Sequence, residues 1–290
     1  MQWFDYARPR TLDEAAKLLA EHGDRARILA GGTDILVQLR AGARAAEMVI
    51  DVKDIPELNE IHWDGSTGLT LGAAVPCYRI YGNADIKQHY AGIIDVASLI
   101  GGTQIQGRAS LGGNLCNSAP SADAIPLMIV LGATCRIVGP SGERTVAVED
   151  FCTAPGKNIL QAAELLVSIH FPAPKPNSGA HYMRFIPRNE MDIAVAGAGV
   201  SVVLENGNFA SARVALASVA PTPLFVKEAG EALAGQPVND ESIARAAAIA
   251  KNAAKPIDDM RGTVRYRKHL CEVLTRRALQ VAVQRAKGSN

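Results

Sequence analysis

Two short glycine-rich stretches constrain this chain more than any other feature. The first spans residues 28–34 and contains Gly31 and Gly32, and the second spans residues 108–114 and contains Gly112 and Gly113. Each pair follows an apolar run, where a strand would end, and glycines there let successive backbone N–H groups converge on a ligand. Two such groups of amides in one chain indicate a long anionic ligand, such as the pyrophosphate of a dinucleotide.

The composition is that of a globular protein with room for two or three lobes. Of the 290 residues, 48% are hydrophobic and 20% are charged, which excludes a disordered chain. The formal net charge of +1 gives no reason to expect nucleic acid or an acidic membrane as partner. Residues 1–6 lack an apolar run and no stretch approaches 18 apolar residues, so we expect no signal peptide, no membrane span and a cytoplasmic location.

The cysteines and histidines do not have the spacing of metal ligands. The five cysteines are scattered and no two form a C-x-x-C, so a locally built zinc or iron–sulfur site is disfavoured. The six histidines are also far apart in the sequence. We therefore expect reduced thiols, mostly buried, and no metal in this chain.

Strand and helix patterns divide the first part of the chain into two lobes, residues 1–55 and 56–175. In the first lobe, Thr11 and Glu14 form a capping box that starts a helix, and Gly23 ends it. The remaining predicted elements are strands 27–30 and 48–52 in lobe 1, and strands 69–73, 134–138, 144–148 and 165–171 with helices 93–100 and 123–131 in lobe 2.

A proline-rich segment at 172–176 marks the next boundary, because prolines there cannot continue a sheet or helix. Beyond it, strands 194–204 and 210–219 flank Asn206 and Gly207, a strong hairpin signal. Helices are predicted at 226–233, 240–254 and 261–286. Residues 178–287 are therefore predicted to form a separate α+β domain.

Neither glycine stretch matches a common nucleotide motif. The chain lacks both G-x-G-x-x-G and a P-loop, and no clear helix is predicted after the first stretch. Thr33 and Asp34 offer a hydroxyl and a carboxylate to a ribose or flavin, although a plain turn is the alternative. In the second stretch, Ser110 and Asn114 add small polar groups. Asp123 either stabilises the start of a helix capped by Ser121 or binds a cofactor sugar.

These motifs together resemble a known family. Residues 30–34, 110–114 and 118–123 are similar to the FAD-binding medium subunit of the molybdenum hydroxylases, which include xanthine dehydrogenase and the aerobic carbon monoxide dehydrogenases. Residues 182–194 and 259–267 resemble two further stretches of that family, so the resemblance covers essentially the whole chain. It implies an α+β fold: a two-lobed FAD-binding region of the vanillyl-alcohol-oxidase (PCMH) type, followed by a C-terminal α+β flavoprotein domain.

The resemblance also implies which residues contact FAD. Arg184 matches a position that is often lysine, and Ile100 falls where some relatives place an aromatic residue over the flavin, so Tyr182 is expected to cover that face instead. The implied cofactor-binding residues are Leu29, Ala30, Gly31, Gly32, Thr33, Asp34, Ile100, Ala109, Ser110, Gly112, Gly113, Asn114, Asp123, Leu166 and Arg184.

As to function, the resemblance implies an electron-transfer subunit with FAD as its only redox centre and no catalytic residue of its own. A large molybdopterin-binding subunit and a small [2Fe–2S] subunit are the implied partners, in a dimer of heterotrimers. A stand-alone flavin oxidoreductase and a non-enzymatic nucleotide-binding scaffold are the alternatives. The basic residues between 261 and 277 are either a solvated helix face or a docking surface.

Overall fold

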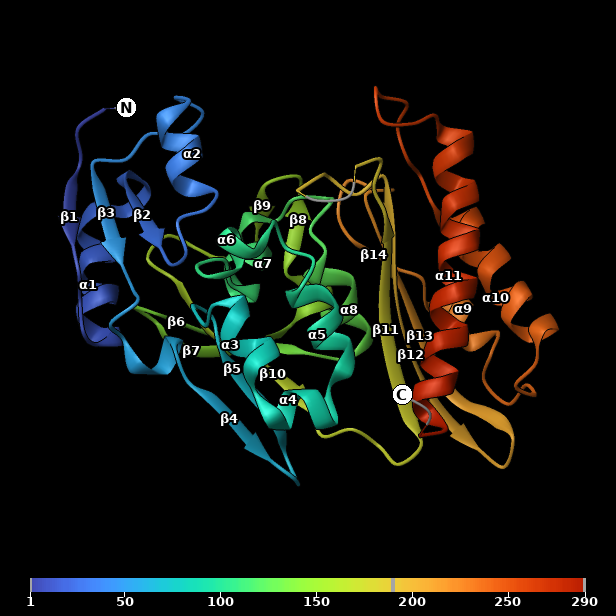
Figure 1. Cartoon of the computed structure of the whole chain (residues 1–290). Helices are drawn as coiled ribbons and strands as arrows, with labels where there is room; N and C mark the ends of the chain where they lie inside the picture. Colours follow the sequence, from blue (N-terminus) through green and yellow to red (C-terminus); the bar gives the residue numbers. More distant parts are fainter. Residues whose placement is uncertain (1, 189–190, 289–290) are drawn as a thin grey trace.

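A computed structural model describes residues 2–188 and 191–288 of the chain. Figure 1 shows the parts following one another in space as they do in sequence, with the small N-terminal lobe in blue at one side. A central mixed region in green follows it. A sheet covered by long helices, in orange and red, lies at the opposite side. The chain is α+β, as predicted.

Lobe 1 is built on a short parallel sheet in the order β1-β3-β2. Its apolar core includes Ala15, Leu19, Ile50 and Val52. The predicted strands 27–30 and 48–52 are present as β2 and β3. Helix α2 was not predicted, although it directly follows the first glycine stretch. The elements are β1 (Asp5–Ala7), α1 (Leu12–His22), β2 (Ala26–Leu29), α2 (Ile35–Arg40) and β3 (Met48–Asp51).

Only half of the predicted capping box forms at the start of α1. The Thr11 hydroxyl accepts the Glu14 backbone N–H at 3.2 Å, as expected. The Glu14 carboxylate accepts the N–H of Arg10 at 2.8 Å rather than that of Thr11. The helix still ends at His22 with Gly23 in a positive-φ conformation, as the sequence predicts.

Lobe 2 contains an antiparallel sheet in the order β4-β5-β10-β6-β7 and a set of short helices. The predicted hairpin of β6 and β7 is present. The predicted helix 93–100 runs instead over Ala91–Ala97. The strands are β4 (Ile61–Asp64), β5 (Gly68–Gly72), β6 (Thr134–Gly139), β7 (Gly142–Ala147), β8 (Cys152–Ala154), β9 (Lys157–Asn158) and β10 (Leu165–Pro172). The helices are α3 (Cys77–Gly82), α4 (Ala84–His89), α5 (Ala91–Ala97), α6 (Thr103–Gln106), α7 (Leu111–Asn117) and α8 (Ala124–Val130).

The C-terminal domain is an antiparallel sheet in the order β11-β12-β13-β14 with helices on one face. Asn206 and Gly207 both have positive φ and form the predicted hairpin turn between β12 and β13. The domain consists of β11 (Ser178–Phe185), β12 (Ala196–Glu205), β13 (Asn208–Ala217), β14 (Leu224–Phe225), α9 (Lys227–Glu231), α10 (Asp240–Ala253) and α11 (Val264–Ala286).

Helix α8 joins lobe 2 to the C-terminal sheet. All of its residues are apolar and buried, and it packs on β12 and β13. A Cβ on Gly199 would lie 2.9 Å from the carbonyl carbon of Pro126, so the glycine lets the sheet approach the helix closely. The Ser201 hydroxyl and the Arg213 guanidinium donate to carbonyl groups at the end of α8, at 2.6 and 3.0 Å. The two regions therefore share a continuous buried contact.

A half-buried polar cluster adds a second connection between these regions. The Asp95 carboxylate on α5 accepts two hydrogen bonds from Arg285 on α11, at 2.6 and 2.9 Å. Oδ2 of Asp95 also lies 2.6 Å from Nδ1 of His181 on β11. Burial alone would raise the pKa of Asp95, but the bonds from Arg285 and His181 lower it on balance.

Candidate functional site

The two glycine stretches meet in space and form facing walls of one cleft. A Cβ on Gly31 would lie 2.3 Å from the carbonyl oxygen of Arg108, so only glycine fits at this contact. The Arg108 side chain in turn donates from Nε to the Gly31 carbonyl oxygen at 2.9 Å. Packing and a hydrogen bond thus hold the end of β2 against the segment that leads into α7.

The first wall is the turn between β2 and α2. Gly32 has a φ of +82°, which lets the chain turn from the strand into the helix. Within the described parts of the chain, the amides of Gly32, Thr33 and Asp34 donate to no protein acceptor. Burial raises the pKa of the Asp34 carboxyl. This wall therefore presents free N–H donors, as the sequence predicts.

The second wall is the first turn of helix α7, not a bend after a strand as the sequence suggested. Ser110 caps this helix by accepting the Gly113 N–H at 3.0 Å. The amide of Gly112 has no protein acceptor among the described residues. A Cβ on Gly112 would lie 2.4 Å from the carbonyl oxygen of Ala73, so the helix packs directly on the chain after β5. Packing overrides the low helix propensity of glycine here.

The empty space between these walls, including its mouth, is about 1090 Å³. Most residues predicted to bind the cofactor line it. The predicted residues in its lining are Ala30, Gly31, Gly32, Thr33, Asp34, Ile100, Ala109, Ser110, Gly112, Gly113, Asn114 and Leu166. Their binding role stays a prediction, but the fold brings them to one place from four separate segments.

Several residues in the cleft were not predicted. The side chains of Arg27 and Arg44 bring positive charge to it, and Nε of Arg27 is buried without a partner among the described residues. Glu164 is also in the lining, but Arg144 holds its carboxylate through two bonds of 2.7 Å. Burial raises the pKa of the Cys116 thiol to about 12, so this cysteine remains protonated at neutral pH. The unpaired charges favour an anionic ligand.

Three predicted residues lie outside the lining of the cleft. Leu29 packs in the lobe 1 core beside Leu39 and Val49. Asp123 and Arg184 form a buried ion pair, with Nη1 of Arg184 2.5 Å from Oδ2 of Asp123. Burial raises the pKa of Asp123 in spite of this pairing. Both residues therefore face each other across the junction between α8 and β11, and their role toward a cofactor stays a prediction.

Tyr182 does not cover the cleft, contrary to expectation. Its side chain is 1% exposed, and its hydroxyl donates to Oδ1 of Asp123 at 2.8 Å. A Cβ on Gly197 would lie 2.3 Å from that hydroxyl, so the glycine provides the space for it. Ser121 is not the helix cap either, because Asp123 occupies the position before α8. Neither side chain could be placed from local sequence.

The cleft fits an elongated ligand that contains phosphate. Amides without protein acceptors lie in both walls, glycines leave room for close approach, and Arg27 and Arg44, which have no carboxylate partner among the described residues, supply positive charge. Ile100 and Leu166 add apolar surface on which a ring system can pack. The fold and the cleft are therefore those expected of a protein that binds a dinucleotide-type cofactor.

Comparison with known proteins gives the family. Residues 2–174 match the FAD-binding domain in molybdopterin dehydrogenase, and residues 181–282 match the CO dehydrogenase flavoprotein C-terminal domain. The chain therefore belongs to the family of FAD-binding medium subunits of the molybdopterin dehydrogenases, the group that contains xanthine dehydrogenase and carbon monoxide dehydrogenase. It is an oxidoreductase subunit of the flavoprotein type.

Individual relatives are similar over nearly their whole lengths. The xanthine dehydrogenase FAD-binding subunit of Escherichia coli O157:H7 is 32% identical, covering 98% of this chain and 99% of the relative. The carbon monoxide dehydrogenase medium chain of Afipia carboxidovorans is 33% identical, covering 98% of each. A structure of carbon monoxide dehydrogenase from Oligotropha carboxidovorans matches with a TM-score of 0.94 at 32% identity, covering 98% of this chain and 99% of that one.

A further structure extends the comparison. Quinoline 2-oxidoreductase from Pseudomonas putida 86 matches with a TM-score of 0.91 at 27% identity, covering 99% of this chain and 98% of that one. Separately, no helix within residues 2–188 and 191–288 is both long and apolar enough to span a bilayer.

Proposed function

We propose that this chain holds FAD in the cleft between its lobes and transfers electrons within a molybdenum hydroxylase complex. It would receive them from the [2Fe–2S] clusters of a small partner subunit and pass them to an external acceptor. A large molybdopterin-binding subunit would oxidise the substrate. The contact between Gly31 and Arg108 carries this proposal, because it joins the two walls whose amides point to one ligand.

The residues present fit FAD. Free amides at Gly32 to Asp34 and at the first turn of α7 would hold its phosphates. Ile100 and Leu166 would pack against its apolar ring surfaces, and Arg27 and Arg44 would balance its negative charge. We further propose that Asp123, Arg184 and Leu29 support this site from behind its walls.

Bound FAD supplies the redox chemistry, because it can accept electrons singly and donate them in pairs. The contribution of the chain is to bind the cofactor, orient it and exclude water. No general base is needed for that task. Cys116, the thiol in the lining, remains protonated at neutral pH, and the Glu164 carboxylate is already held by Arg144. This arrangement supports an electron-transfer role over direct action on a small substrate.

The organisation proposed for the chain follows from the same reading. Residues 1–55 and 56–175 would be the two FAD-binding lobes, and residues 178–287 the C-terminal flavoprotein domain. A dimer of heterotrimers in the cytoplasm is the proposed assembly. Its support comes from the full-length similarity to medium chains of carbon monoxide dehydrogenases, together with cysteines that remain unpaired in the described structure.

The test begins with the purified chain. Its absorption spectrum and the nucleotide released on denaturation should identify FAD, at about one per chain. A chain that stays colourless after incubation with excess FAD would contradict the proposal. Isolation of the native complex should in addition recover molybdenum and iron, whereas an active flavoprotein without either metal would support the stand-alone alternative.

A further inference from the structure

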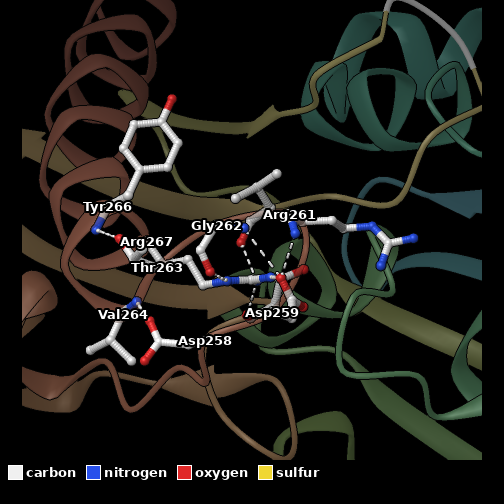
Figure 2. A network of polar contacts seen from close by, with 10 residues as sticks. Asp258, Asp259, Arg261, Gly262, Thr263, Val264, Tyr266 and Arg267 are labelled. Atoms are coloured by element: carbon white, nitrogen blue, oxygen red, sulfur yellow. Dashed lines mark hydrogen bonds and ion pairs between the residues drawn. The ribbon is translucent and has the colours of Figure 1, made fainter.

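The loop before α11 is held by an unusually complete polar network, shown in Figure 2. The Asp259 carboxylate accepts the backbone N–H groups of Arg261 and Gly262, at 2.8 and 3.2 Å. It also accepts a bond of 2.6 Å from the guanidinium of Arg267 on α11. Thr263, which follows Gly262, caps helix α11. The turn at residues 259–262, called here the tip, is therefore fixed at both of its ends.

Arg267 anchors this network in the domain core. It was predicted to lie on a basic helix face, either solvated or docked on a partner, but it is only 4% exposed. Its Nη1 donates to the carbonyl oxygens of Val195 and Ser218, at 2.8 and 3.1 Å. A buried arginine is costly unless all its donors are used. Here the donors of Arg267 connect the tip to Val195, just before β12, and to Ser218, just after β13.

The tip displays side chains that the domain itself does not use. Met260 is 94% exposed. The Arg261 guanidinium has no partner in the described part of the chain, and Figure 2 shows it extending away from the Asp259 network. A fixed conformation lowers the entropy lost on binding, so a rigid display of exposed apolar and basic groups indicates a contact surface.

Other exposed apolar side chains lie on the segments next to the tip. A Cβ on Gly262 would lie 3.4 Å from Val195, and the ring of Tyr266 packs edge-on against Phe185, so the segment around 191–195 lies beside the tip. Contiguous exposed apolar surface marks interaction sites. The tip patch is defined as Met191, Ile193, Ile257, Met260 and Tyr266, all of which are exposed.

The tip patch continues to the wall of the cofactor cleft. A Cβ on Gly102 would lie 3.3 Å from both Cγ and Sδ of Met191. Two residues earlier, Ile100 lines the cleft. A partner that covers the patch would therefore reach the edge of the cleft, where a donor of electrons has to approach.

Among the described residues around the patch, Arg261 and Arg265 outnumber the one carboxylate without an ion-pair partner, Asp258, which accepts only the backbone N–H of Val264. The Asp259 carboxylate is paired with Arg267, and Asp192 with Arg188. Arg261 and Arg265 have no such partner there. Positive charge at a docking surface speeds the association of a partner whose surface carries the opposite charge.

We propose that the tip patch, with Arg261, is the surface on which the iron–sulfur subunit docks. This inference rests on the proposed function, because it assumes that such a subunit delivers the electrons. It adds the location: the partner would contact residues 191–195, the loop before α11, and the cleft beside Gly102.

The test uses the complex isolated through a tag on this chain. Met260→Glu and Arg261→Glu should each lower the iron recovered per chain by about tenfold, because both place unfavourable charge at the centre of the contact. The FAD content should stay at the wild-type level, since neither side chain lines the cleft. Matched controls are Tyr78→Glu, an exposed apolar residue on α3, and Arg277→Glu, an exposed arginine on α11.

The possible outcomes distinguish a wrong docking surface from a wrong proposed function. Full iron recovery with both tip variants, from a wild-type complex that contains FAD and iron, would overturn the docking surface alone. A wild-type preparation that contains FAD but never iron would overturn the proposed function, and the docking surface with it. Loss of iron in the controls as well would show that the contact lies elsewhere or is nonspecific.

Discussion

Gly31 and Arg108 are 77 residues apart in sequence, yet the carbonyl oxygen of one accepts a hydrogen bond from the side chain of the other at 2.9 Å. The Gly31 Cα also lies against the Arg108 main chain, where no Cβ fits. The separation of the two amide-bearing walls is set by this contact. The geometry of the cleft therefore depends on a residue that contributes no side chain at all.

Gly31→Ala is expected to separate the walls. The added methyl group would lie 2.3 Å from a backbone oxygen, so the backbone must shift, at a cost of about 1–3 kcal/mol. We expect a lower thermal midpoint and little bound FAD. Gly107→Ala is the matched control, because its Cβ would meet only one atom, at 3.6 Å. Equal FAD content in the two variants would show that the contact does not shape the cleft.

Gly113→Val tests the second wall. Gly113 lies in helix α7, and a Cβ there would touch only the Ser110 hydroxyl, at 3.1 Å. The branched side chain would occupy the cleft in front of the free amides. Titration of FAD into the apo-protein should show binding weakened by about tenfold or more, which corresponds to about 1.4 kcal/mol. Binding unchanged by the valine would place the cofactor away from α7.

Asp95 should make the junction between the two regions sensitive to acid. Its pKa is lower in the folded state than in the unfolded chain, so its contribution to stability is present above about pH 4 and decreases as the pH falls through the folded-state value. Asp95→Asn should cost about 2 kcal/mol near neutral pH. Urea unfolding between pH 3 and pH 7 measures both effects, since the variant should show the smaller loss in acid. A matching pH dependence in variant and wild type would exclude Asp95 as its source.

Arg267→Met should loosen the tip and weaken the domain. The substitution leaves the Val195 and Ser218 carbonyl oxygens and the Asp259 carboxylate without their shared donor. We expect a loss of about 3 kcal/mol or more in the free energy of unfolding, and faster proteolysis within residues 255–263. Arg276→Met, on the exposed side of the same helix, is the control. Protease resistance equal to wild type would contradict the anchoring role.

Local sequence patterns predicted the elements whose cause is local. Asn206 and Gly207 determine a hairpin turn by their own conformational preferences, and the predicted helix 240–254 was found as Asp240–Ala253 behind its cap, Asn239. Helix α7 could not be predicted, because its glycines disfavour a helix in isolation. Packing of Gly112 against Ala73 imposes the conformation instead.

The candidate site divides in the same way. The glycine stretches can be recognised in the sequence as sources of backbone N–H donors, and the fold brings the two stretches together. Arg27 and Arg44 carry no such signal, since an arginine becomes part of a cleft only through the positions of neighbouring segments. The pairing of Asp123 with Tyr182, 59 residues away, likewise depends on how β11 docks on α8. Contacts of this kind are properties of the folded chain.

The position of α8 has a practical consequence for anyone who wishes to study the parts in isolation. A fragment that ends at the proline-rich segment would expose to water the apolar side of α8 that packs on the C-terminal sheet. The isolated C-terminal domain would expose the matching face of that sheet. Both fragments should aggregate in solution. The chain should therefore be expressed at full length to remain in solution.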